Sequence, residues 1–127
     1  MGDRSSHWDE DMKVAIGTGD GVFVTEHFGF ATQFQIWDLG SGAPRLIETR
    51  RNLPACGAGP RADATALMDR SVETVSDCRA VVVARIGECA LTRLTALGIL
   101  AFEADEPVKV ALREISAFLA DQAGVPA

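Results

Sequence analysis

Two kinds of hydrophobic pattern divide the chain. Up to residue 50, apolar residues form short alternating or continuous runs that turn residues separate, and from residue 61 they recur every three or four positions. Short runs of this kind are typical of strands, and the spacing of three to four is typical of amphipathic helices. The pattern therefore predicts a β-rich first half and a second half that alternates helices with strands.

The first half predicts an antiparallel meander. Its four strands are expected at residues 13–17, 22–24, 33–37 and 45–50. The dipeptide Asp20-Gly21 is a strong turn signal, so the first two strands are expected to form a hairpin. The third strand alternates with a period of two, which predicts that one of its faces is buried.

The second half predicts three helices and two more strands. The helices are expected at residues 61–76, between Gly87 and Gly98, and at 105–119, and the strands at 80–84 and 99–102. The β-branched run of the first of these strands is typical of a parallel strand that is buried on both faces. With right-handed crossovers, the result is a mixed α/β sheet of about five to six strands with three helices, the ribonuclease H-like topology.

Length and composition narrow the functional classes. The 127 residues suffice for one domain, expected over 12–120, with 1–11 as a disordered leader or a cloning remnant and 121–127 as a frayed tail. Acidic residues outnumber basic ones by 18 to 12, and the net charge of −6 argues against nucleic-acid binding. No apolar run is long enough to cross a membrane. Three irregularly spaced cysteines make no disulfide framework, which favours a reducing cytoplasm.

A histidine in the first half is the main candidate for metal chemistry. His27 lies in the turn Glu26-His27-Phe28-Gly29, between two apolar segments. Histidine is the commonest metal ligand, and Gly29 allows the backbone to approach another group closely. The alternative is an ordinary polar histidine in a turn.

A cysteine and an arginine are expected at the carboxyl edge of the sheet. Strand 80–84 is followed at once by Arg85, and Cys89 falls in the first turn of the next helix. Ligands of open α/β sheets bind beyond the carboxyl ends of the strands, and a helix N-terminus favours the thiolate that ligates metals. A half-buried small residue for Cys89 and a surface charge for Arg85 are the alternatives.

A loop rich in glycine and proline holds a second cysteine. Cys56 lies in this loop, and Arg50, Arg51 and Arg61 flank it, so the arginines are candidates to cradle an anionic ligand. A solvated cluster of charges is the alternative. Cys78 precedes strand 80–84 and is expected to be structural.

Some metal chemistries do not fit the sequence. The first strand, 13–17, carries none of the carboxylates that a ribonuclease H nuclease needs. No Cys-x-x-Cys pair exists, and no spacing fits a zinc, ferredoxin or haem site. A preformed cluster needs fewer protein ligands, because its core is already made, and one histidine with one or two thiolates suffices to hold it.

Several segments, taken together and in order, resemble one family. The segments are Met12-Lys13-Val14-Ala15-Ile16, Glu26-His27-Phe28-Gly29-Phe30-Ala31, Phe34-Gln35-Ile36-Trp37-Asp38, Ile47-Glu48-Thr49-Arg50, Asp77-Cys78-Arg79-Ala80-Val81-Val82, Arg85-Ile86-Gly87 and Leu97-Gly98-Ile99. They resemble the dinitrogenase iron–molybdenum cofactor biosynthesis family, which includes NifX, the core domain of NafY and the C-terminal domain of NifB. The resemblance runs from about residue 12 to about residue 119.

The resemblance implies a carrier rather than an enzyme. It implies that the chain binds a preformed nitrogenase iron–molybdenum cofactor or its iron–sulfur precursor, between the cofactor assembly proteins and apo-dinitrogenase. The family's cofactor-binding histidine maps onto His27. The run from Arg50 to Cys56 looks most like the C-terminal domain of NifB, although the radical-SAM cysteine motif of full NifB is missing. Some relatives bind a molybdenum–copper sulfide cluster, and this cargo stays an alternative.

Two hypotheses from other classes stay open. One is a thiol enzyme that uses Cys89 as nucleophile and His27 as base, which requires the two side chains within hydrogen-bond reach. The other is a regulatory or adaptor domain that binds protein partners and no cluster, which an unusually large apolar surface patch would favour.

Overall fold

The structure is a computed structural model, and it describes residues 12–40, 43–52 and 61–122. The expected leader at 1–11, the last five residues of the expected tail and the loop that holds Cys56 lie outside the described residues.

Five strands form one mixed sheet. They are β1 (Lys13–Gly17), β2 (Gln33–Asp38), β3 (Arg45–Arg51), β4 (Ala80–Val83) and β5 (Leu100–Glu103), in the order β3-β2-β1-β4-β5. The first three strands pair antiparallel, and β4 and β5 run parallel to β1. The carboxyl ends of β1, β4 and β5 therefore meet at one edge of the sheet. The expected mixed α/β sheet is confirmed, and its strand order is the ribonuclease H-like one.

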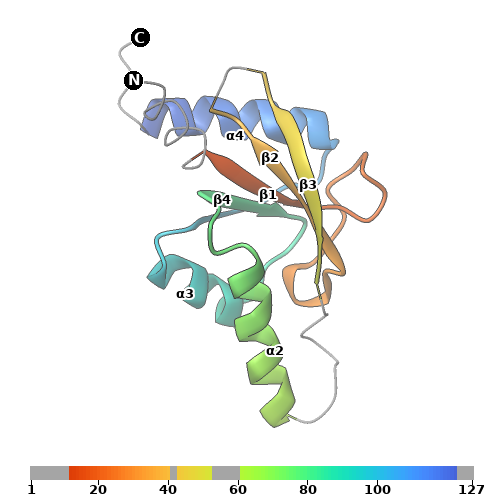
Figure 1. The fold of residues 1–127 in the computed structure, drawn as a ribbon, viewed down its shortest axis with the longest axis vertical. Coiled ribbons are helices and arrows are strands. Elements are labelled where there is room, and N and C mark those ends of the chain that lie inside the picture. The colour runs from red at the N-terminus through yellow and green to blue at the C-terminus, as the bar shows by residue number, and fades with distance from the viewer. Residues whose placement is uncertain (1–11, 41–42, 53–60, 123–127) are drawn as a thin grey trace.

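In the part of the chain that the structure describes, three α-helices cover the two faces of the sheet. They are α2 (Arg61–Thr74), α3 (Glu88–Ala96) and α4 (Val108–Gln122). Figure 1 shows α4 packed along one face, with α2 and α3 on the opposite face. No helix within the described ranges is long and apolar enough to span a membrane.

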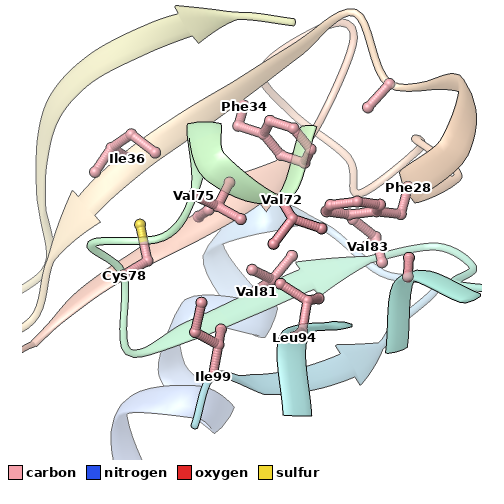
Figure 2. Close-up of a cluster of buried hydrophobic side chains, with 13 residues drawn as sticks. Phe28, Phe34, Ile36, Val72, Val75, Cys78, Val81, Val83, Leu94 and Ile99 are labelled. Carbon is pink, nitrogen blue, oxygen red and sulfur yellow. The ribbon is translucent and has the colours of Figure 1, made fainter. Parts of the chain in front are cut away.

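Each face of the sheet has its own hydrophobic core. On the α4 side, residues such as Ile16 and Val82 pack against Leu112 and Ile115 of the helix. On the other side, Figure 2 shows Phe28, Phe34, Val81 and other residues gathered between the sheet and α2 and α3. The strand residues alternate between the two cores, as the pleat of a sheet buried on both faces requires.

The hairpin predicted at 22–24 is wrong, because this segment pairs elsewhere. The Asp20 carboxylate accepts hydrogen bonds from the amides of Val22 and Phe23, at 2.8 and 3.0 Å, so the chain turns away from β1. These backbone hydrogen bonds also hold the pKa of Asp20 below its usual value. The segment then bonds to the loop before α4, where the Val24 amide donates to the Glu106 carbonyl at 3.0 Å. Of the three apolar residues, Val24 is buried, whereas Val22 and Phe23 are exposed, and the segment forms no ladder with β1.

Candidate functional site

The turn that carries His27 is fastened to the carboxyl end of β4. The Phe28 amide donates to the Arg85 carbonyl, and the Ala84 amide donates to the Glu26 carbonyl, both at 2.8 Å. These two bonds make an isolated parallel bridge between His27 and Arg85. The two residues that the sequence assigned separately to the site are therefore neighbours on the backbone.

A buried aromatic side chain anchors the same turn. Phe28 begins a short 3-10 helix, Phe28–Phe30, and its side chain is fully buried in the core under α2 and α3. Its ring packs against Phe34 of β2 with 5.5 Å between the centroids. Burying a phenylalanine side chain contributes about 1.5–3 kcal/mol. The anchor holds the position of His27, which stays exposed.

A glycine explains why the turn lies so close to the sheet. A Cβ atom added to Gly17, at the end of β1, would lie 2.8 Å from Val83 Cγ1 and 3.1 Å from Glu26 Cβ. Any larger residue would push the turn away from β4. The Gly17 carbonyl also accepts the amides of Thr25 and Glu26, at 3.1 and 3.3 Å. The backbone before His27 is thus fixed on both sides.

An exposed aromatic ring stands beside the histidine. The Phe30 ring meets the His27 ring edge-on, with 6.2 Å between the centroids and 65° between the planes. Phe30 is 56% exposed, which is costly for a phenylalanine in water. The two rings give the turn one polar, metal-ligating side chain next to one apolar surface.

Cys89 occupies the position that the sequence predicted, in the first turn of α3. The helix begins at Glu88, with Gly87 as its N-cap, and the thiol is exposed. The Arg93 guanidinium donates a hydrogen bond to its sulfur and another, at 2.6 Å, to the Asp69 carboxylate of α2. Asp69, with a smaller contribution from Cys89, raises the pKa of Arg93. Cys89 thus lies four residues beyond Arg85, next to a cation.

Arg50 is engaged in an ion-pair network. Its guanidinium donates to both carboxylate oxygens of Asp77, at 2.7 and 2.9 Å, and also bonds Glu48 and the Thr74 carbonyl. Asp77 is the main cause that raises the pKa of Arg50, and Arg50 holds the pKa of Asp77 well below its usual range. The hydrogen bonds of Arg50 thus connect β3 to the end of α2, and its guanidinium donors are used within the protein.

Arg51 is exposed at the end of β3, where it pairs with Gln33 of β2. The neighbouring Asn52 donates its backbone amide to the Thr32 carbonyl at 2.8 Å and its side-chain amide to the Ala31 carbonyl at 2.9 Å. Thr32, Gln33, Arg51 and Asn52 line a hollow of about 360 Å³. The structure therefore separates the two arginines that the sequence grouped together.

Cys78 is structural, as the sequence predicted. Its side chain is 5% exposed and points into the core shown in Figure 2, at the amino end of β4. Burial, with a smaller contribution from the adjacent Asp77 carboxylate, raises the pKa of Cys78 to about 12. The thiol is therefore protonated at any physiological pH.

The structure adds three residues that the sequence did not assign to the site. Phe30 flanks His27, Asn52 braces the turn after it, and Arg93 contacts the Cys89 sulfur. The spacing of Cys89 and Arg93, four residues apart in one helix, was the available signal for the last contact. In the described ranges, the candidate site included, no three His, Cys, Asp or Glu side chains converge to hold a metal ion.

Comparison with known proteins decides the family. The family described as "Dinitrogenase iron-molybdenum cofactor" matches residues 11–117, most of the chain. This chain belongs to the dinitrogenase iron–molybdenum cofactor family. Membership assigns it to the biosynthesis or binding of the iron–molybdenum cofactor, in nitrogen fixation. The family resemblance stated from the sequence is thereby confirmed.

The chain spans about a fifth of the length of the curated relatives that it matches. The FeMo cofactor biosynthesis proteins NifB of Frankia alni and Herbaspirillum seropedicae are 35% and 33% identical to it over 111 and 88 residues. These matches cover 87% and 69% of the chain, but 22% and 16% of the two relatives. The chain therefore corresponds to one part of such a protein.

A solved structure shares the fold of this family member. The apo form of the orange protein from Desulfovibrio gigas aligns with it at a TM-score of 0.64 and 18% sequence identity. The alignment covers 88% of this chain and 90% of the orange protein. At this identity the similarity establishes the fold alone.

Proposed function

We propose that this domain binds a preformed nitrogenase iron–molybdenum cofactor, or its iron–sulfur precursor, and carries it between cofactor assembly proteins and apo-dinitrogenase. The observation that carries the proposal is His27, an exposed imidazole on a turn bonded to the end of β4. A carrier needs a ligand that is fixed before the cargo arrives and that the cargo can reach and leave. The assembly proteins and apo-dinitrogenase are the expected partners, in the cytoplasm.

Exposed cations at the same edge of the sheet as His27 suit an anionic cluster. Arg85 is exposed and paired with His27 through the backbone, and Arg51 is exposed at the end of β3. Neither makes an ion pair within the described part of the chain, although the whole protein carries a net charge of −6. Unpaired cations in an acidic protein attract an anionic cargo toward this edge.

Thiolates are proposed as the assisting ligands. Cys89 is exposed at the start of α3, and the Arg93 guanidinium donates a hydrogen bond to its sulfur. Cys56 lies outside the described residues and keeps its place as the second candidate. Arg50 is removed from the proposed ligand-binding set, because Asp77 and Glu48 occupy its donors.

Binding without catalysis is the function that this geometry supports best. A thiol enzyme needs a hydrogen bond between Cys89 and His27. In the described residues, the hydrogen-bond partner of the Cys89 thiol is Arg93, and no bond joins the thiol to His27. This arrangement supports the binding of a cargo over a thiol enzyme that uses these two residues.

The test is anaerobic transfer of cofactor to the apo protein. Isolated iron–molybdenum cofactor is mixed with wild type, His27→Ala and His7→Ala, and iron and molybdenum are measured in the protein peak after gel filtration. We expect co-elution with wild type and with His7→Ala, the matched histidine control, and loss of co-elution with His27→Ala. Equal retention by all three would overturn the ligand assignment, and no retention by wild type would favour a molybdenum–copper cluster or an adaptor role.

A further inference from the structure

An apolar groove runs along α4, on the face of the sheet opposite α2 and α3 (Figure 1). It has a volume of about 650 Å³, and its lining combines α4 with Trp37 of β2 and with Pro44, which directly precedes β3. The helix residues that line it are Lys109, Leu112, Arg113, Ser116, Ala117 and Ala120. They form two adjacent rows with a spacing of four residues, and such rows are the ridges through which helices pack on one another.

The two halves of this helix face differ in size and in charge. In the amino half, Lys109 and Arg113 are long, basic and exposed. In the carboxyl half the same row continues with Ala117 and ends at Asp121, both exposed, and the small side chain of Ala120 lies beside it. Among the residues that the structure describes, none forms an ion pair with the two cations or with Asp121. One half thus offers long basic side chains, and the other offers space and a carboxylate.

A second copy of the same helix, running in the opposite direction, matches both halves at once. Its basic half then lies over the small residues of the first helix, and its Lys109 comes opposite Asp121. Rows of every fourth residue on two helices interdigitate at a crossing angle of about −50°, which is the commonest class of helix packing. Because a two-fold axis repeats each contact, a single interface contains two pairs of Lys109 with Asp121. The face is therefore complementary to itself in both shape and charge.

We propose that this face of α4 is a homodimer interface, in which the α4 helices of two copies pack antiparallel. Lys109 of each copy pairs with Asp121 of the other, and the aliphatic stems of Lys109 and Arg113 lie in the groove of the other copy. A second copy is the occupant that the observations favour, because complementary charges in opposite halves of one face are what a two-fold interface requires. The proposal uses no residue of the candidate cofactor site, so it stands independently of the proposed function.

Sedimentation velocity of the full-length protein tests the proposal through charge reversal at the two ends of the interface. Wild type is expected to dimerise as its concentration rises through the micromolar range. Lys109→Glu brings two carboxylates together and Asp121→Lys brings two ammonium groups together, so each variant alone should dimerise at least about tenfold more weakly. Both side chains are exposed, so circular dichroism should show an unchanged fold. The matched control is Arg70→Glu, an exposed charge reversal on α2, which should dimerise like wild type.

A mixture of the two reversed variants distinguishes this interface from any other. When Lys109→Glu pairs with Asp121→Lys, opposite charges face each other again at both ends, so the mixture should regain the affinity of the wild-type dimer. A mixture that associates no better than each variant alone would overturn the proposal, as would a dimer that ignores both reversals. A wild type that stays monomeric at every concentration would also overturn it, and would leave the groove to a different protein.

Discussion

A cysteine lies near each end of β4, buried at the amino end and exposed beyond the carboxyl end. At the amino end, Cys78 is buried in the core, and its neighbour Asp77 is bonded to Arg50 and Lys13. At the carboxyl end, Cys89 and His27 are exposed, and the backbone of the His27 turn is fixed to Arg85. At one end the side chains are paired or buried inside the protein, and at the other they are exposed to solvent.

The difference shows that residue type does not identify a site. Both cysteines lie next to an arginine and a carboxylate, with Arg50 and Asp77 near one and Arg93 and Asp69 near the other. Burial decides the outcome, because desolvation keeps the Cys78 thiol neutral and out of reach of ligands. An exposed thiol at a helix start is free to bind.

The same substitution at both cysteines should give the largest contrast. Cys78→Asp places a carboxylate in the core beside Asp77, and we expect it to lower the free energy of unfolding by more than about 3 kcal/mol. Cys89→Asp places the carboxylate in the first turn of α3 beside Arg93, where we expect a change within about 0.5 kcal/mol. Urea unfolding followed by circular dichroism measures both. If the two substitutions changed the free energy of unfolding equally, the proposed difference between the two ends of β4 would be wrong.

Asp77→Ala should sharpen the comparison, because it removes the main ion-pair partner of Arg50 at the amino end of β4. The carboxylate accepts both Arg50 hydrogen bonds, and the substitution leaves that guanidinium without its main partner. We expect a loss of about 1–2 kcal/mol, because Asp77 is partly exposed and solvent screens the pair. Glu73→Ala, an exposed change of the same charge on α2, is the control and should be near neutral.

Acid titration of the wild type provides a second measure of how much Asp77 contributes to the free energy of unfolding. Arg50 holds its pKa below the ordinary value of 3.8, so its stabilising contribution is complete above about pH 4 and is lost as the pH falls further. Urea unfolding between pH 5 and pH 2.5 should therefore show a steeper loss of stability in wild type than in Asp77→Ala. Parallel curves would show that the pair contributes nothing.

The smallest change in the free energy of unfolding is expected at alkaline pH, where Cys78 titrates. Burial raises the pKa of this thiol from an ordinary 9.0 to about 12, so between these values only the unfolded chain loses the proton. Stability then falls as the pH rises, and at pH 10 the contribution of Cys78 is lower by roughly 1.4 kcal/mol. Cys78→Ala should flatten this part of the stability curve, whereas Cys89→Ala should leave it unchanged.

Much of the fold follows from the sequence because its signals are local. The alternation of Phe34 and Ile36 predicted β2, and the β-branched run from Val81 to Val83 predicted β4. The segment 22–24 was predicted wrongly, because the Asp20 side chain takes the amides that a hairpin would use. A side chain that bonds the backbone a few residues on leaves no trace in a hydrophobic pattern.

The candidate site was predictable only in part. Arg85 and Cys89 were placed by the rule that ligands bind at the carboxyl ends of strands, and His27 by its residue type and its turn. The structure brings His27 and Arg85 together through the backbone. The role of Arg50 was not visible, because Asp77 lies 27 residues further along the chain and across the sheet. Pairing of charges over such a separation depends on the tertiary structure.

The most direct test compares cofactor binding in His27→Ala and Asp77→Ala. Apo protein is titrated anaerobically with isolated iron–molybdenum cofactor, bound iron is measured after gel filtration, and urea unfolding is recorded for the same samples. We expect His27→Ala to keep wild-type stability and weaken binding by about tenfold or more, as loss of a ligand does, while Asp77→Ala loses stability and keeps its affinity. If His27→Ala bound the cofactor as tightly as wild type, the exposed end of β4 would not be the binding site.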